Sequence, residues 1–96
     1  MKVTLKQAFN LLDGRLSTEI GDVYEMLNYI FNTSFMTHEL PPAMRRLEEI
    51  NPDWYSEGKE LINDIKAENN TDDFHLLMSI IDSEYPDLFI ELQQIK

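Results

Sequence analysis

Apolar residues recur every three or four positions along nearly the whole chain. At its start they are Leu5, Ala8, Phe9 and Leu12. This spacing is that of one face of an α-helix. Strict alternation of apolar and polar residues, which is typical of a half-buried strand, covers no useful length, although the first few residues leave a short strand open. The pattern predicts an all-α fold, a compact single domain of five or six short helices over residues 1–96.

Cap and turn residues indicate where the first helices begin and end. Thr4 is expected to cap the first helix, and Gly14 is expected to end it. Ser17 or Thr18 is expected to cap the second helix, and Gly21 in its first turn indicates a close approach of another backbone. The second helix has one broad apolar face, formed by Ile20, Val23, Tyr24, Leu27, Ile30 and Phe31.

Prolines mark the later boundaries. Leu40-Pro41-Pro42 is typical of a helix start and begins the third helix, and Asn51-Pro52 separates it from the fourth. Thr71 is expected to cap the fifth helix. A last short helix is expected to close the chain, with the apolar residues Leu88, Phe89 and Leu92.

Negative charge is concentrated in the second half of the chain. The 96 residues include 18 acidic and 8 basic ones, for a formal charge of -10. Charges balance over residues 1–46, so the whole excess falls in residues 47–96. Nucleic acid and anionic lipid repel such a chain, so we expect neither direct nucleic-acid binding nor membrane binding. The expected partner is a basic surface of another protein or of a ribonucleoprotein complex.

The composition excludes several classes of protein. Hydrophobic residues make up 43% of the chain, which is too many for a disordered one. The lack of cysteine removes disulfides and thiolate metal sites, and it fits a reducing cytoplasm. No apolar stretch has the length of a membrane span, and polar residues interrupt any signal-like run near the start. We therefore expect a cytoplasmic protein.

The sharpest signal lies in the fourth predicted helix, where acidic residues recur at spacings of four, three, four and four. They are Asp53, Glu57, Glu60, Asp64 and Glu68. At about 100° per residue they fall within roughly 80° of one another, in a stripe about 22 Å long. Their mutual repulsion opposes helix formation by roughly 1–2 kcal/mol, and Lys59 and Lys66 on another side relieve little of it. The stripe resembles a row of nucleic-acid phosphates; the alternative is a solvated face that keeps a small protein soluble.

Patterns for catalysis and metal binding are weak. His38-Glu39 does not begin a metal-binding pair on a helix, because position 42, four residues after His38, is proline. A site of His38 and His75 completed by a carboxylate stays open, but the spacing does not favour it. The alternative is that Thr37 or His38 bonds the backbone where the third helix begins. Since no serine lies in a nucleophile motif and the glycines are dispersed, we expect no enzyme, no metal and no cofactor.

Three short motifs occur between residues 13 and 45, namely G-R-L, G-D-V-Y-x-x-L-N and T-H-x-L-P-x-A. They fall on Gly14, Arg15, Leu16, Gly21, Asp22, Val23, Tyr24, Leu27, Asn28, Thr37, His38, Leu40 and Pro41. This stretch, about a third of the chain, resembles a family of small uncharacterised bacteriophage and prophage proteins. The resemblance implies a mobile element inside a host bacterial cell, where small acidic phage proteins often bind and disable host machinery. It implies no mechanism, and the acidic second half lies outside it.

Four polar residues of these motifs form a second candidate site. They are Arg15, Asp22, Asn28 and His38. In one interpretation they converge into a small binding site. In the structural alternative, Asp22 pairs with Arg15 across the turn between the first two helices, and His38 helps to fix the start of the third.

Three functional hypotheses follow. The first is a non-catalytic inhibitor of the anti-CRISPR or anti-restriction kind, whose acidic helix occupies a basic nucleic-acid-binding surface of a host defence complex. The second is a phage assembly, packaging or regulatory adaptor that binds a protein without mimicry, with a homodimer through Trp54, Tyr55 or Phe35 left open. The third, a small enzyme built on paired carboxylates, is one that we do not expect.

Overall fold

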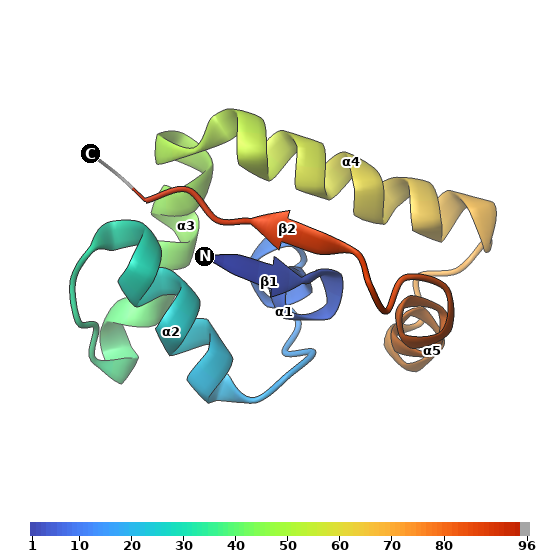
Figure 1. Ribbon diagram of the computed structural model, residues 1–96, viewed down its shortest axis with the longest axis horizontal. Coiled ribbons are helices and arrows are strands. Elements are labelled where there is room, and N and C mark those ends of the chain that lie inside the picture. Colours follow the sequence, from blue (N-terminus) through green and yellow to red (C-terminus); the bar gives the residue numbers. More distant parts are fainter. Residues whose placement is uncertain (95–96) are drawn as a thin grey trace.

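Helix α1 lies near the centre of the molecule, and most of the other elements pack against it (Figure 1). The computed structural model describes residues 1–94. α1 contacts α2, α4, α5 and both strands. In chain order the elements are β1 (Lys2–Thr4), α1 (Leu5–Leu12), α2 (Ile20–Phe31), the short 3₁₀ helix η1 (Thr37–Glu39), α3 (Leu40–Ile50), α4 (Pro52–Glu68), α5 (Phe74–Glu84) and β2 (Phe89–Glu91).

Buried apolar side chains from all five α-helices form a single core. The apolar positions predicted for α1 are all buried, and the apolar face predicted for α2 is confirmed except at Ile20, which is 50% exposed, and Tyr24, which is half-buried. The Cα radius of gyration is 13.1 Å, as expected for a compact chain of about 100 residues. Residues 1–94 thus form a compact, mostly helical structure of five α-helices and a small two-stranded sheet, and no helix among them has the length and apolar character of a membrane span.

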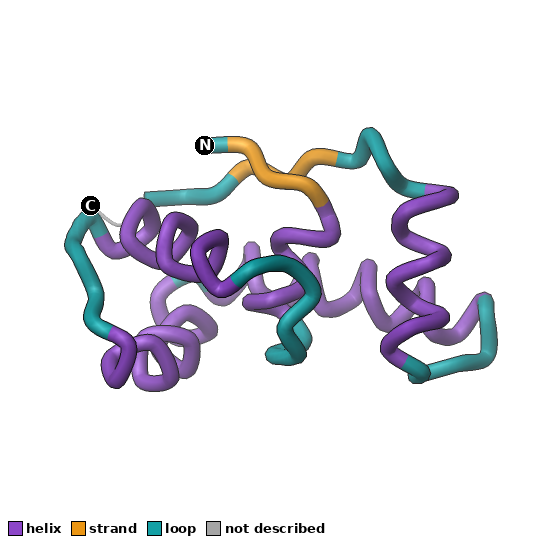
Figure 2. The backbone as a smooth tube through the Cα atoms, turned by 90° about the horizontal axis from the view of Figure 1, so that it is seen from below, coloured by secondary structure: helices purple, strands orange, loops and turns teal. Residues whose placement is uncertain are grey.

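Strands β1 and β2 pair antiparallel, with Val3 opposite Ile90 (Figure 2). The short strand that the sequence left open at the start of the chain is therefore confirmed. Backbone hydrogen bonds extend the pairing at both ends: the N–H of Leu92 donates to the carbonyl of Met1 at 2.8 Å, and the N–H of Leu5 donates to that of Leu88 at 3.1 Å.

The last predicted helix, around Leu88, Phe89 and Leu92, is wrong, because this stretch forms β2. Its five residues fit both periods, and a stretch this short does not distinguish a helix from a strand. In the structure Leu88, Ile90 and Leu92 are at least half-buried, whereas Phe89 and Glu91 are exposed. This is the alternation of a strand, and the partner that selects it lies at the other end of the sequence.

The predicted cap of α2 by Ser17 or Thr18 is also wrong, because α2 begins after Glu19. The buried Asn10 binds both residues instead. Its Oδ1 accepts hydrogen bonds from the N–H of Ser17 at 2.7 Å and of Thr18 at 3.3 Å. Its Nδ2 donates to the Thr18 hydroxyl at 2.7 Å. Asn10 therefore fastens the α1–α2 connection to α1.

The predicted start and end of α1 are correct, whereas the predicted cap of α5 is wrong. Thr4 caps α1, and Gly14 follows α1 with a φ of 90°, a left-handed conformation that glycine adopts readily. At α5 the cap is Asp73, whose carboxylate accepts from the N–H of Leu76 at 2.9 Å. The predicted cap, Thr71, instead binds the N–H of Asp73.

The close approach predicted at Gly21 occurs at Gly58 instead. A Cβ atom at Gly21 would meet nothing within 4 Å, whereas one at Gly58 would lie 2.6 Å from the Cδ atoms of Leu12. Leu12 is buried in the core. Gly58 therefore allows α4 to pack directly on α1.

Candidate functional site

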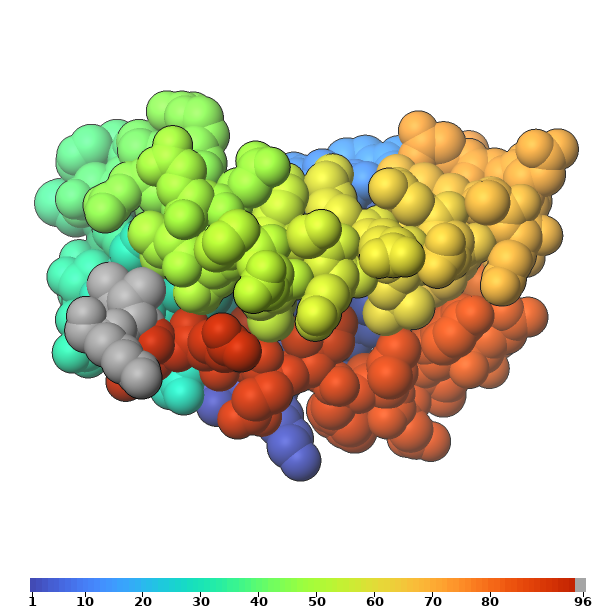
Figure 3. Space-filling view, turned by 90° about the horizontal axis from the view of Figure 1, so that it is seen from above, coloured from blue at the N-terminus to red at the C-terminus, as the bar shows by residue number. Residues whose placement is uncertain are grey.

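The acidic residues of α4 form an exposed row, which we call the acidic ladder. Its members are Asp53, Glu57, Glu60, Asp64 and Glu68. They are all the acidic residues of the helix, and each of them is exposed. The helix runs along one face of the molecule with its outer side uncovered (Figure 3). The five residues predicted for partner binding therefore share one surface.

The two lysines of α4 do not neutralise the ladder. Lys66 binds Asp13 at 3.1 Å and Asp72 at 3.0 Å, and the Nζ of Lys59 lies 5.9 Å from the ring centroid of Tyr55. Within residues 1–94 no carboxylate of the ladder takes part in an ion pair. The row therefore faces solvent without a basic side chain bound to it within these residues.

The inner face of α4 holds the ladder in place. Trp54, Ile62 and Ile65 are buried on this face. The indole N–H of Trp54 donates to the carbonyl of Glu91 at 3.1 Å, which joins α4 to β2. Trp54 is only 9% exposed, so the surface exposure that made it a candidate for a homodimer contact is not observed.

Two acids and two bases tie the far end of α4 to its neighbours. Asp13, just after α1, accepts hydrogen bonds from Arg15 and from Lys66. Both bases also bind Asp72 in the α4–α5 connection, each at 3.0 Å. The network therefore connects α1, α4 and the segment that leads into α5.

This network lowers the pKa of both carboxyl groups. Burial by itself would raise the pKa of Asp13, but hydrogen bonds from Arg15 and Lys66 outweigh burial and bring the pKa below its ordinary value. Hydrogen bonds from Lys66 and then Arg15 lower the pKa of Asp72. Both acids are therefore ionised at neutral pH and engage Lys66 away from the ladder.

The four residues of the second candidate site are not joined to one another. They are Arg15, Asp22, Asn28 and His38, and no hydrogen bond or ion pair within residues 1–94 joins any two of them. The predicted pairing of Arg15 with Asp22 is wrong, since Arg15 binds Asp13 and Asp72. Asn28 accepts the N–H of Phe35 at 2.8 Å and so shapes the loop after α2. His38 is exposed on η1.

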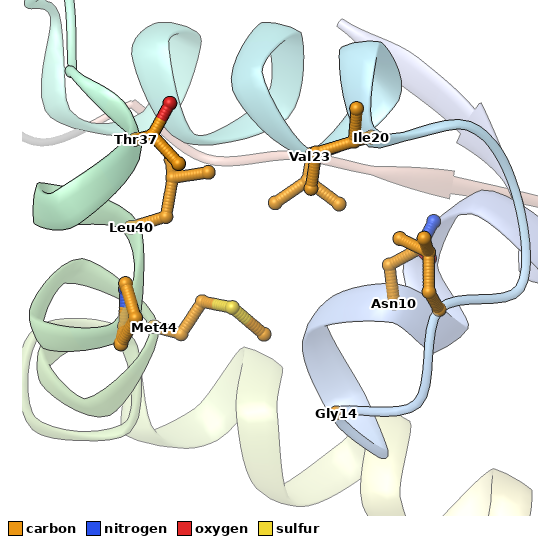
Figure 4. Close-up of a pocket in the computed structure, with 9 residues that line it drawn as sticks. Asn10, Gly14, Ile20, Val23, Thr37, Leu40 and Met44 are labelled. Atoms are coloured by element: carbon orange, nitrogen blue, oxygen red, sulfur yellow. The ribbon is translucent and has the colours of Figure 1, made fainter.

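A groove runs along α3, between this helix and the connection from α1 to α2; we call it the α3 groove. Its apolar end is a hollow of about 350 Å³. Figure 4 shows Leu40 and Met44 of α3 on one side of it and Val23 of α2 on the other. Leu16 and Ile20 stand at the rim, 52% and 50% exposed. Sequence reasoning missed the groove, because Ile20 fits the apolar face of α2 and looked like a core residue.

The groove continues into a second hollow of about 410 Å³, which shares Gly14 and Met44 with the first. The polar residues that line this end are Asp13, Arg45, Glu48 and Tyr55. Burial raises the pKa of Tyr55, and the negative charges of Glu48 and Asp13 raise it further. The groove therefore has one apolar end and one polar end, and the polar end is lined by two carboxylates and one guanidinium.

His38-Glu39 has a structural setting at the start of α3. The carboxylate of Glu39 accepts the N–H of Met36 at 2.8 Å. Glu39 therefore bonds the backbone just before α3, and the prediction that Thr37 or His38 does so is wrong. The Thr37 hydroxyl instead bonds with the Tyr24 hydroxyl. Within residues 1–94, no group of three or more histidine and carboxylate side chains stands close enough to hold a metal ion.

Residues 3–60 match the model of a protein family described as a domain of unknown function, DUF7736. The chain belongs to this family. The matched stretch contains the whole α3 groove, whereas the acidic ladder continues beyond it at Asp64 and Glu68. No curated protein and no solved structure matches the chain.

Proposed function

We propose that this protein is a non-catalytic inhibitor of the anti-CRISPR or anti-restriction type, which binds the basic nucleic-acid-binding surface of a host defence complex. It acts in the cytoplasm of a bacterial host, as the resemblance of residues 13–45 to bacteriophage proteins implies. One observation carries the proposal: the carboxylates of the acidic ladder are exposed together and lie outside the ion pairs of residues 1–94.

The geometry of the ladder suits a surface that binds phosphates. Successive carboxylates advance by about 4.5–6 Å along the helix axis, so the row presents regular negative charge over about 22 Å. A groove of lysine and arginine side chains receives a similar row of charges from a nucleic-acid strand. The formal charge of -10 also attracts a basic target and raises the rate of association, most strongly at low salt.

The alignment of the ladder favours binding over solubility as its role. Neighbouring acids three and four residues apart repel one another, at a total cost of roughly 1–2 kcal/mol. Interspersed charges of both signs keep a surface soluble without this repulsion. In α4 the two lysines instead contact Asp13, Asp72 and Tyr55 on the other flank of the helix.

Competition with DNA tests the proposal. Plating of phages on bacteria that each carry one CRISPR or restriction system identifies the system that the protein inhibits. With the purified complex, the apparent inhibition constant should rise in proportion to the concentration of target DNA, and it should rise again with added salt. Protection against no such system, or inhibition that DNA does not compete with, contradicts the proposal.

An adaptor that binds a protein partner without mimicry is the second candidate. It is favoured by large apolar side chains that the structure leaves exposed, namely Leu16, Ile20, Met36, Leu76 and Phe89. A complex formed through such side chains persists at high salt and survives reversal of the ladder charges. A pull-down at low and at high salt therefore distinguishes the two candidates.

A further inference from the structure

Both polar side chains that line the apolar end of the α3 groove, Asn10 and Thr37, already have hydrogen-bond partners. Asn10 lies at its wall, but the Asn10 amide nitrogen donates to Gln7 and Thr18, and its oxygen accepts from Ser17 and Thr18. The hydroxyl of Thr37, which also lines this end, is bonded to that of Tyr24. An occupant therefore meets mainly apolar side chains here, which favours an aliphatic or aromatic group.

Large apolar side chains are exposed at the rim of this end. Leu16 and Ile20 expose about half of their surface beside the hollow, so a partner that covers this surface gains a favourable hydrophobic contribution. Pro41 is exposed at the same rim. A ligand confined to the hollow leaves these side chains in water, whereas a segment of a protein chain covers them as well.

Charge distinguishes the other end of the groove. Glu48 is exposed and takes part in no ion pair within residues 1–94, whereas Asp13 is already bound by Arg15 and Lys66. Two carboxylates, those of Asp13 and Glu48, line this hollow beside Tyr55, against one guanidinium, that of Arg45. A cation that enters the hollow therefore finds the exposed carboxylate of Glu48.

We propose that the α3 groove binds a segment of another protein that combines an apolar anchor with a basic residue. The anchor, a large aliphatic or aromatic side chain, fills the apolar end, and a lysine or arginine lies against Glu48. The two ends are about 10 Å apart along α3, a span of about three residues in an extended segment and about seven in a helix. This inference concerns a different flank of α4 from the ladder, and it holds whether or not the ladder mimics nucleic acid.

Selection from a displayed library of random 12-residue peptides tests the proposal on the full chain. The Ile20→Glu variant serves for counter-selection, because it places a charge at the rim of the groove. Leu76→Glu is the matched control, since Leu76 is a similarly exposed apolar residue (48%) on α5, away from the groove. Selected peptides should carry an aliphatic or aromatic residue and a lysine or arginine about three or about seven positions apart.

Binding of the selected peptides by calorimetry should then weaken at least about tenfold with Ile20→Glu and about fivefold with Glu48→Lys, and stay within about twofold with Leu76→Glu. Failure to select any peptide, selection of peptides without a basic residue, or equal weakening by Ile20→Glu and Leu76→Glu overturns the proposal. The variant Glu57→Lys/Glu60→Lys/Asp64→Lys should bind the peptides within about threefold of wild type. Loss of peptide binding in that variant alone would place the site on the ladder and also overturn the proposal.

Discussion

Asp13 holds the far end of α4 in position. Its side chain is only 8% exposed, and Arg15 and Lys66 both donate hydrogen bonds to it. Since Asp13 directly follows α1, this one carboxylate joins the end of α1 to the helix that carries the acidic ladder. The stability of the network and the position of the ladder therefore depend on the same residue.

Asp13→Asn should lower the free energy of unfolding by about 1–3 kcal/mol at neutral pH, because Arg15 and Lys66 lose a charged acceptor. Because the pKa of Asp13 in the folded protein lies below its ordinary value of 3.8, the folded form binds the proton less readily than the unfolded one. The contribution of Asp13 is therefore complete above about pH 5 and is lost as the pH falls through about 4 and then through the lowered pKa. Urea denaturation over this range measures both effects.

The control for this variant is Asp64→Asn, which neutralises an exposed carboxylate outside the ion pairs of residues 1–94. Its unfolding free energy should stay within about 0.5 kcal/mol of wild type or rise slightly. Asp13→Asn should flatten the loss of stability in acid. An unchanged acid dependence in Asp13→Asn would show that this carboxylate does not stabilise the fold.

The capping residues show where local sequence reasoning succeeds. Thr4 caps α1 by accepting the N–H of Gln7, and the Gln7 side chain accepts the N–H of Thr4, so both partners lie within one short window of sequence. Ser17 and Thr18 have the same composition signal, but their partner is Asn10, which reaches them only after the chain has turned at the end of α1. A partner brought in by the tertiary fold leaves no signal in the local pattern.

At the scale of the elements, the contact of α4 with α1 depends on Gly58. Gly58→Ala should lower stability by about 1–2 kcal/mol, because strain against the buried Leu12 exceeds the gain in helix propensity of about 1 kcal/mol. Gly21→Ala meets no atom within 4 Å and should raise stability by a few tenths of a kcal/mol up to about 1 kcal/mol. Thermal unfolding of the pair measures the difference. Equal effects of the two substitutions would show that no close packing exists at Gly58.

Repulsion between the carboxylates of the acidic ladder should destabilise α4. Glu60 has like charges on both sides, at Glu57 and Asp64, so Glu60→Gln should stabilise the protein by about 0.4–1 kcal/mol at low salt. The gain should shrink as salt screens the remaining charges. Denaturation at low and at high salt checks both statements, and a gain of the same size at both would indicate a cause other than repulsion.

The helices and the strands differ in how well the sequence predicts them. α4 continues for 17 residues, so its apolar period and its acidic stripe both repeat often enough to be recognised. β2 has three residues and is selected by pairing with β1 from the other end of the chain. The strand is therefore decided by a long-range contact that no local window contains.

For the molecule as a whole, the same distinction separates the two candidate surfaces. The ladder lies on one helix, so its members share a face as soon as that helix forms, and the sequence predicts them correctly as a row. The α3 groove is assembled from α2, α3 and the connection after α1, so it exists only in the folded protein. Glu57 lines a hollow beside Ile90 of β2, whereas Tyr55 lines the groove, which places the two surfaces on different flanks of α4.

Inhibition of the target defence complex by two charge-reversed variants tests the role of the ladder most directly. One is Glu57→Lys/Glu60→Lys/Asp64→Lys, and its control is Glu25→Lys/Glu84→Lys/Asp87→Lys, which reverses three exposed acids away from α4 and changes the net charge equally. With helicity retained in both, the ladder variant should lose inhibition by at least about a hundredfold, and the control should stay within about threefold of wild type. Full inhibition by the ladder variant, or an equal loss in both, would contradict a role for the acidic ladder in binding.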